Sequence, residues 1–127
     1  MPRKASRKTL VKKLDKAVSE YIRGRDGCCV VCGSDYQLGN SHIFTRKNYS
    51  TRWDVSDAGN CHAGCWKCNF YHSSVEQWKY FNWYIDKFGQ DNFDELYRRH
   101  KTVIKFTTYD LEVLLQEIEV KRLTTGR

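Results

Sequence analysis

The stretch that decides the fold of this protein is NCHAGCWKCNFYH, which spans residues 60–72. Its thirteen residues include three cysteines, two histidines and two asparagines. A tetrahedral zinc ion takes four ligands, so these side chains offer more donor atoms than one zinc ion needs. The stretch therefore serves either one metal site with spare ligands or two sites with different tasks.

Two CxxC pairs predict a structural zinc site. Cys29 and Cys32 form the first pair, Cys65 and Cys68 form the second, and 32 residues separate them. Four thiolates at this spacing suit a closed tetrahedral site, which stabilises the fold and does no chemistry. The gap exceeds the roughly 15–20 residues of a compact zinc ribbon, so a segment is inserted between the pairs. Unrelated disulfides or buried thiols are the alternative, but cysteines without a secretion signal are typical of metal binding.

The zinc site uses only cysteines, so a second group of side chains in this region still has no assigned role. His42 ends a strand predicted at residues 36–44, and Asn60 lies in a second strand predicted near residues 60–63. Asn69 and His72 follow on a helix that opens around residue 65, and their spacing of three places them on one helix face. A strand histidine facing such a pair is the layout of a one-metal phosphodiesterase.

In such a site each side chain has a distinct expected role. His42 takes a proton from water, provided that its pKa lies near neutrality. Asn69 and His72 hold a Mg²⁺ or Mn²⁺ ion, which binds the scissile phosphate and stabilises the leaving oxygen. Asn60 keeps the hairpin and the imidazole in register by hydrogen bonds. The competing interpretation is that His42 is a structural hydrogen-bonding group, as a lone histidine in a strand commonly is.

The remaining pattern predicts an α+β protein that is mainly helical. Apolar residues recur at helical spacing over residues 6–24, with Gly24 and Gly27 bracketing the end. Further helices are expected over residues 91–100 and from Thr107 or Thr108 onward. Before them in the chain, Ser73 and Glu76 predict a capping box at the start of another helix, which Gly89 ends. Its expected apolar stripe is Trp78, Phe81, Ile85 and Phe88, which leaves Tyr80, Trp83 and Tyr84 as core residues or as a surface for bases or a partner.

We expect a single domain over residues 1–127. It would comprise a basic N-terminal helix (1–25), a metal-bearing core (28–72) and C-terminal helices (73–127). No run of about 18 apolar residues exists, so no membrane span is expected. The first residues, MPRKASRKTLVKKLDK, lack the apolar segment of a secretory signal, so we expect a cytoplasmic protein.

The positive charge gathers at the N-terminus. Residues 1–25 hold nine Lys or Arg against Asp15 and Glu20, whereas the other residues hold thirteen basic and thirteen acidic side chains. This segment is either a phosphate-binding arm or a solvated helix face. Loop arginines and lysines suit a phosphate clamp, or else are ordinary loop charges. The candidate DNA contacts are Lys12, Lys13, Arg23, Arg25, Arg46, Lys47 and Arg52.

The order of these motifs resembles a known group of nucleases. A histidine and two asparagines set between CxxC pairs are similar to the zinc-containing HNH, or ββα-metal, endonucleases and to their phage endonuclease VII branch. A closer likeness is to the phage NinG/Rap recombination nucleases, through EYIRGRD, GNSHIFTR, TRW and NCHAGCWKCN over roughly residues 14–100. The resemblance implies a small ββα-metal core stapled by zinc, with Asn69 as a metal ligand. It also implies cleavage of branched DNA, such as Holliday junctions or D-loops, during phage recombination in a host cell.

One position departs from the pattern of that group. Many of its members carry Asp or His just before the catalytic histidine, where it binds the catalytic ion. Here that residue is Ser41, a poor ligand for a hard cation. Ser41 therefore joins Asn69 and His72 as a tentative ligand, and Asp54 or Asp57 is a candidate for the missing carboxylate.

Three functions remain open from the sequence. The first is a metal-dependent endonuclease, and two symmetric cuts in branched DNA would suit a homodimer, although nothing in the sequence shows one. The second is a non-catalytic DNA-binding or architectural protein stabilised by zinc, which Ser41 favours. The third is a zinc-stapled adaptor that uses its aromatic helix to bind a protein, which the basic N-terminus disfavours.

Overall fold

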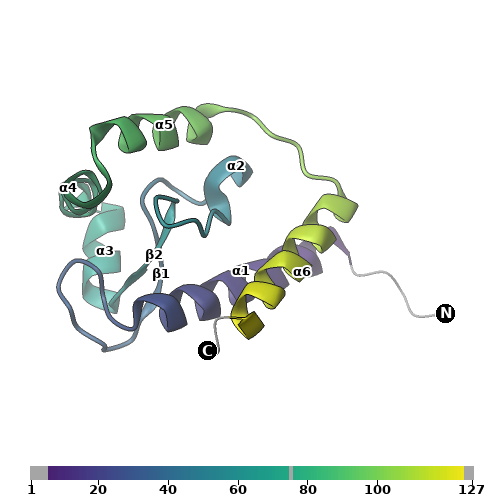
Figure 1. Ribbon diagram of the computed structural model, residues 1–127, viewed down its shortest axis with the longest axis horizontal. Helices are drawn as coiled ribbons and strands as arrows, with labels where there is room; N and C mark the ends of the chain where they lie inside the picture. Colours follow the sequence, from purple (N-terminus) through teal and green to yellow (C-terminus); the bar gives the residue numbers. More distant parts are fainter. Residues whose placement is uncertain (1–5, 75, 125–127) are drawn as a thin grey trace.

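The computed structural model describes residues 6–74 and 76–124. Within them the protein is mainly helical α+β, as predicted, with a small two-stranded sheet (Figure 1). Residues 1–5 of the predicted basic segment lie outside the described part. No helix among the described residues is long and apolar enough to span a membrane. The elements are α1 (Arg7–Asp26), β1 (Gly39–His42), α2 (Tyr49–Arg52), β2 (Cys61–Gly64), α3 (Trp66–Ser74), α4 (Gln77–Phe88), α5 (Gln90–Lys101) and α6 (Thr108–Thr124).

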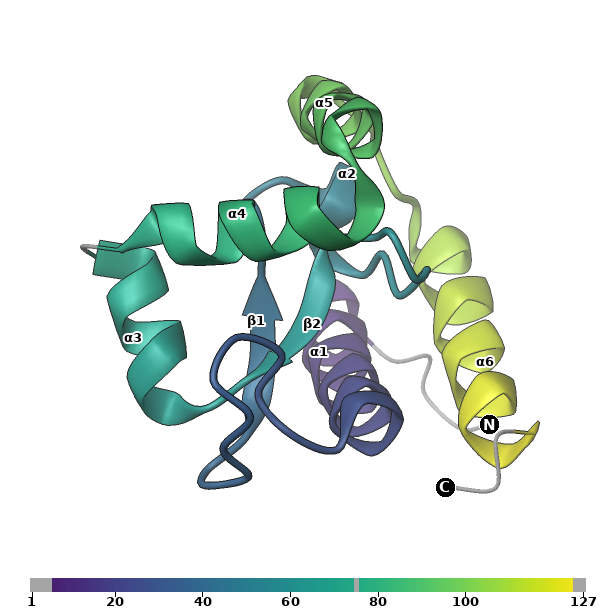
Figure 2. The same cartoon turned by 60° about the vertical axis from the view of Figure 1, so that its left-hand side comes forward.

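The hairpin of β1 and β2 is the centre of the fold. The strands are antiparallel, with Ser41 opposite His62 and His42 opposite Cys61. Because side chains alternate along a strand and directly opposed residues share a face, Asn40, His42 and Cys61 lie on one face of the hairpin. Ser41 and His62 lie on the other face. The short α2 lies between the two strands in the chain, and β2 leads directly into α3 (Figure 2).

The first face of the hairpin is covered by α1, and α6 packs along α1, so that the two helices lie side by side in both views (Figures 1 and 2). Ser6 caps α1 by accepting a hydrogen bond from the Thr9 amide, and Gly27 ends the helix at φ 72°. Thr107 caps α6, as predicted, by accepting a bond from the Asp110 amide at 3.1 Å. The predicted amphipathic N-terminal helix is therefore confirmed. Its buried residues, together with those of β2 and α6, are Leu10, Leu14, Ala17, Val18, Ile22, Cys61, Ala63, Leu111 and Ile118.

A second core lies between α4, α5 and the segment after β1. It buries Tyr80 and Tyr84 of α4 with Leu96 of α5 and Ile43. The predicted apolar stripe of α4 is therefore wrong at Trp78, which is 57% exposed, whereas Phe81 and Phe88 pack at the edge of this core and Tyr80 and Tyr84 are its buried residues. The predicted stripe and the tyrosine pair both recur at helical spacing, so the period alone does not decide which face of α4 is buried. The Tyr80 hydroxyl lies so close to Gly64 of β2 that any side chain at Gly64 would collide with it, and this contact places the tyrosine face of α4 against the hairpin.

The predicted capping box at the start of α4 is also wrong. Ser73 belongs to α3, which continues through Ser74. Glu76 occupies the N-cap position of α4 and makes no side-chain capping hydrogen bond there. Its carboxylate instead pairs with Lys79 at 2.6 Å. The extra turn of α3 matters because it carries His72 within the same helix as Asn69.

Candidate functional site: a cysteine cluster and the adjoining His42 pocket

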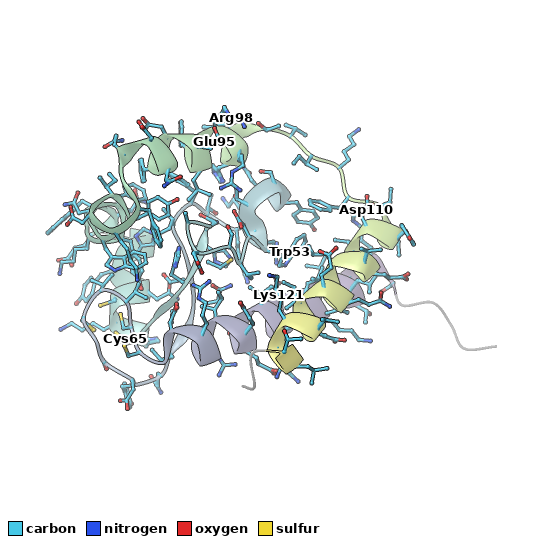
Figure 3. All side chains as sticks on the ribbon, viewed as in Figure 1. Trp53, Cys65, Glu95, Arg98, Asp110 and Lys121 are labelled. Carbon is cyan, nitrogen blue, oxygen red and sulfur yellow. The ribbon has the colours of Figure 1, made fainter. Side chains whose placement is uncertain are left out.

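The four predicted zinc ligands come together in space. The sulfur atoms of Cys29, Cys32, Cys65 and Cys68 all lie within 4.8 Å of one another. Figure 3 places Cys65 at the end of the molecule away from α6, where α3 begins. The other pair sits in a turn that is fixed by backbone bonds, from the Cys29 amide to the Ser34 carbonyl and from the Val30 amide to the Ala63 carbonyl.

This cluster fits a structural zinc ion. Tetrahedral zinc with bonds of about 2.3 Å places its sulfurs roughly 3.8 Å apart, and the Cys32 and Cys65 sulfurs are 3.6 Å apart. Among the described residues, no other group of three or more His, Cys, Asp or Glu side chains is close enough to hold an ion. Cys28 and Cys61 stand outside the cluster.

The thiols of the cluster differ in acidity. Burial opposes ionisation of Cys29, but backbone amide donors, led by that of Cys32, favour its thiolate and lower its pKa to about 6. Burial and the neighbouring thiols raise the pKa of Cys68. The Cys29 thiolate thus forms easily, and its negative charge disfavours ionisation of the neighbouring thiols. A divalent cation bound by the sulfurs would relieve this repulsion.

A pocket adjoins the cluster along α3. It has a volume of about 500 Å³ and is lined by residues of β1, the loop after it and α3. Cys65 and Cys68 at the start of α3 thus belong to the cluster, whereas Asn69 and His72 belong to the pocket. We call this the His42 pocket; its polar lining includes Asn40, His42, Arg46, Lys47, Asn69 and His72.

The orientation of the His42 ring is fixed by one hydrogen bond. Its Nε2 lies 3.0 Å from the Arg52 carbonyl oxygen, which accepts only, so Nε2 carries the proton and Nδ1 has a free lone pair. Burial lowers the pKa of His42 to about 4. The condition set for His42 as a base, a pKa near neutrality, is therefore not met in the free protein, because the half-buried ring loses hydration that a charged imidazole needs.

His72 lies on the wall of the pocket with one nitrogen unused. Its Nε2 donates to the carbonyl oxygens of His42 at 2.9 Å and Ile43 at 3.1 Å. Its Nδ1 is buried and has no hydrogen-bond partner among the described residues. Burial lowers the pKa of His72, although the backbone carbonyls of His42, Ile43 and Gln77 oppose the shift. A buried lone pair without a donor is costly unless something else binds it.

Ser41 does not occupy the position of a metal ligand. It is fully buried on the α4 face of the hairpin, opposite to His42, and its Oγ donates to Asn69 Oδ1 at 2.9 Å. Strand alternation turns the Ser41 side chain to the face opposite His42, so the structure favours a role in positioning Asn69 over the predicted role as a ligand. Asn69 still lines the pocket, and the hydrogen bond from Ser41 fixes the orientation of its side-chain amide.

The two loop aspartates do not supply the missing carboxylate. Asp54 accepts a hydrogen bond from Arg99 at 2.6 Å and another from Ser56. Asp57 lines a different hollow, beside Arg25. No Asp or Glu among the described residues lines the His42 pocket. Any cation there would depend on amide and imidazole donors, water and the substrate.

Asn60 holds the backbone that follows His42. Its fully buried amide accepts from the Phe44 amide at 2.8 Å and donates to the Phe44 carbonyl at 2.9 Å. Its own carbonyl accepts from the Ile43 amide at 2.9 Å. These bonds extend the hairpin past β1 and fix the carbonyls of His42 and Ile43 that orient His72.

We expect Asn60→Ala to lower the free energy of unfolding by roughly 2–3 kcal/mol, because two buried backbone groups lose their partners. Urea titration followed by circular dichroism measures this loss. Asn92→Ala is the matched control, since the exposed Asn92 makes one side-chain bond, to Phe88, and should change stability by less than about 0.5 kcal/mol. Equal effects of the two substitutions would contradict the anchoring role.

Two of the predicted DNA-contacting arginines are engaged inside the protein. Arg52 donates to Asp15 at 2.6 and 3.0 Å and lies over the Trp53 ring. Burial opposes the Asp15 charge, but bonds from Arg52 and Trp53 outweigh it and lower the Asp15 pKa. Arg25 donates to the Val55 and Cys61 carbonyls and pairs with Asp26. We therefore withdraw Arg25 and Arg52 as DNA contacts.

The other candidate DNA contacts are accessible. Arg46 and Lys47 are exposed and line the His42 pocket. Lys12, Lys13 and Arg23 are exposed on α1, where they stay a prediction. His62 is buried against Trp83, donates from Nε2 to the Gly59 carbonyl and accepts at Nδ1 from Arg25, so it takes no part in the pocket.

Asn40 is a pocket residue that sequence reasoning missed. It lies two positions before His42 on the same face of β1, and its Oδ1 is buried without a hydrogen-bond partner among the described residues. Strand alternation from His42 was the signal that could have found it.

Comparison with known proteins supplies the family. The model of the family described as bacteriophage lambda NinG protein matches residues 3–124. The chain belongs to the NinG family. No curated protein and no solved structure matches it. The NinG match spans the cysteine cluster, the His42 pocket and all six helices of the described residues. The phage resemblance inferred from the motifs is thereby confirmed at the level of the family.

Proposed function

We propose that this NinG-family protein is a metal-dependent DNA endonuclease of the HNH type that acts in phage recombination. One observation carries the proposal. A single pocket gathers His42, Asn69 and His72 with the cations Arg46 and Lys47, on a strand–strand–helix unit that the four cysteines clamp. These are the residue types that hydrolysis of a phosphodiester needs in one place.

His42 is the proposed general base. The Arg52 carbonyl holds Nε2–H, which leaves Nδ1 to accept a proton from water. The water oxygen then attacks phosphorus, the bond from phosphorus to the leaving oxygen breaks, and that oxygen takes a proton from solvent. With a pKa of about 4 the free imidazole is neutral at pH 7. The negative charge of a DNA phosphate in the pocket would raise that pKa and make the ring a better base.

Asn69 and His72 are the residues that would hold the catalytic cation. Asn69 offers Oδ1, held in place by Ser41, and His72 offers its partnerless Nδ1. When bound, Mg²⁺ or Mn²⁺ would neutralise charge on the phosphate and the leaving oxygen. An imidazole ligand favours Mn²⁺ over the harder Mg²⁺.

Arg46 and Lys47 are proposed to contact the phosphates next to the cleaved bond. Both are exposed at the mouth of the pocket, where neutralising phosphates releases counterions. The preference for branched DNA, and a homodimer that cuts twice, follow from the likeness to recombination nucleases and belong to this proposal.

A second candidate function is a non-catalytic, zinc-stabilised DNA-binding protein. The observation in its favour is that no carboxylate of the described residues lines the pocket. Like the nuclease, such a protein would bind DNA through its exposed cations, and added salt would weaken that binding. It differs in predicting no cleavage with any added cation.

The deciding experiment is cleavage of end-labelled DNA by the zinc-loaded protein. A four-way junction, a flap and a linear duplex are incubated with Mn²⁺, with Mg²⁺ or with no added divalent ion. We expect cleavage that requires the added ion, is faster with Mn²⁺ and favours the branched substrates. Binding of all three DNAs without cleavage in any condition would reject the nuclease in favour of the binding protein.

A further inference from the structure

Two large aromatic rings are presented to solvent on α3. Trp66 is 61% exposed and Phe70 is 53% exposed. Their centroids are 5.7 Å apart and their planes differ by 17°, so the two rings are stacked on each other in nearly parallel planes, and a further ring could extend the stack. Exposed aromatic area of this kind marks a binding surface more often than chance, since burying it would stabilise the protein.

The cysteine cluster holds this surface rigid. Trp66 and Lys67 are the two residues between the ligand pair Cys65 and Cys68, so both ends of the segment that carries them are tied to one centre. Phe70 follows one helical turn after Trp66. A surface fixed in this way loses little conformational freedom when it binds.

The charge around these rings suits a polyanion. The sequence of α3, WKCNFYHSS, contains no acidic residue, and Lys67 beside Trp66 is exposed. The exposed apolar residues of α6 are different, because Tyr109 and Val120 lie next to Asp110 and Glu119. The α3 helix itself therefore carries no carboxylate that would repel phosphates, unlike α6, and the nearest carboxylate in the chain, that of Glu76, is paired with Lys79.

The helix that carries the rings also lines the His42 pocket, although neither ring is part of that lining. Asn69, which lines that pocket, directly precedes Phe70 in α3, and His72 of the same helix bonds the His42 carbonyl. A nucleic-acid strand with a phosphate in the pocket therefore has its neighbouring bases within reach of α3. Aromatic side chains bind bases by stacking without regard to sequence, provided that the bases are unpaired.

We propose that Trp66 and Phe70 form a stacking platform for unpaired bases of DNA. The platform binds nucleotides that lie next to the phosphate in the His42 pocket, and Lys67 contacts their backbone. A continuous duplex keeps its bases stacked on one another, so the platform selects DNA that is open at a branch point or gap. This inference rests on the proposed function, since it assigns the substrate recognition of the same site.

The test is the affinity of the zinc-loaded protein for fluorescein-labelled DNA, measured by anisotropy at one salt concentration without added divalent ion. The probes are a single strand, a junction with unpaired nucleotides and a duplex of equal length. We expect the double variant Trp66→Ala/Phe70→Ala to bind the first two probes about tenfold more weakly and the duplex less than twofold more weakly. Zinc content and circular dichroism establish that the variant is folded.

Two further variants separate stacking from general apolar contact. Trp66→Tyr/Phe70→Tyr keeps flat rings and should retain most of the affinity, whereas Trp66→Leu/Phe70→Leu keeps apolar area and should not. Tyr109→Ala, at a 72% exposed ring on α6, is the matched control and should change nothing. Figure 2 shows α6 and α3 on opposite sides of the hairpin.

Several outcomes would overturn the platform. One is that the alanine variant loses as much affinity for the duplex as for unpaired DNA, and another is that the leucine variant keeps the full affinity of the wild type. A third is that the alanine variant still binds DNA but no longer self-associates. The last would assign the face to contact between two copies of this chain. Cleavage is scored separately: a wild type that binds unpaired DNA through the rings but cuts nothing rejects the nuclease alone, and an active nuclease indifferent to the substitutions rejects the platform alone.

Discussion

Cys65→Ser should unfold most of the protein at ambient temperature. Zinc bound by a four-ligand site contributes roughly 10–16 kcal/mol to the folding of small zinc domains, whereas the net stability of a domain is only about 5–15 kcal/mol. Loss of one of the four sulfurs removes a large part of that contribution. It also releases the start of α3 from the turn that carries Cys29 and Cys32.

Zinc content by mass spectrometry and thermal unfolding by circular dichroism measure the effect of Cys65→Ser. Cys28→Ser is the matched control, because Cys28 is the sequence neighbour of a ligand but stands outside the cluster. The control should keep one zinc per chain and the melting temperature of the wild type. A Cys65→Ser protein with full zinc and an unchanged melting temperature would contradict the structural site.

His42→Ala is expected to slow DNA cleavage by roughly 100- to 10,000-fold, the usual contribution of a general base. The fold should survive, since the substitution removes one side-chain hydrogen bond, to the Arg52 carbonyl, at a cost of about 1 kcal/mol. DNA affinity should be nearly unchanged, because Arg46 and Lys47 remain.

Single-turnover cleavage of the junction with saturating protein and Mn²⁺ measures the effect of His42→Ala. His62→Gln is the control, since His62 lies on the other face of the hairpin and outside the pocket. Its rate, corrected for the folded fraction, should equal that of the wild type. Equal rates for His42→Ala and the wild type would mean that another group accepts the proton.

The features that the sequence predicted well depend on short-range spacing. Paired cysteines with two residues between them, and two helix residues spaced three apart such as Asn69 and His72, have nearly the same geometry in any protein that forms the same turn or helix. The cysteine cluster and the meeting of Asn69, His72 and His42 in one pocket could therefore be foreseen. Asn40 and the burial of Ser41 followed from strand alternation and could also have been predicted.

The features that the sequence predicted poorly depend on contacts between segments that are far apart in the chain. The helical period of α4 fits either Trp78 or Tyr80 as the buried position, and only the approach of Gly64 decides between them. Arg52 resembled a phosphate clamp because its partner, Asp15, is 37 residues away. The low pKa of His42 depends on burial that is created by the folded chain.

The central claim is that the sulfurs serve one ion and the amide and imidazole groups serve another. Calorimetric titration of Mn²⁺ into zinc-loaded protein tests it most directly. We predict one Mn²⁺ site per chain in addition to the retained zinc, at least tenfold weaker in Asn69→Ala and in His72→Ala and unchanged in Cys28→Ser. Absence of a second ion in the wild type, or a second ion indifferent to both substitutions, would contradict the claim.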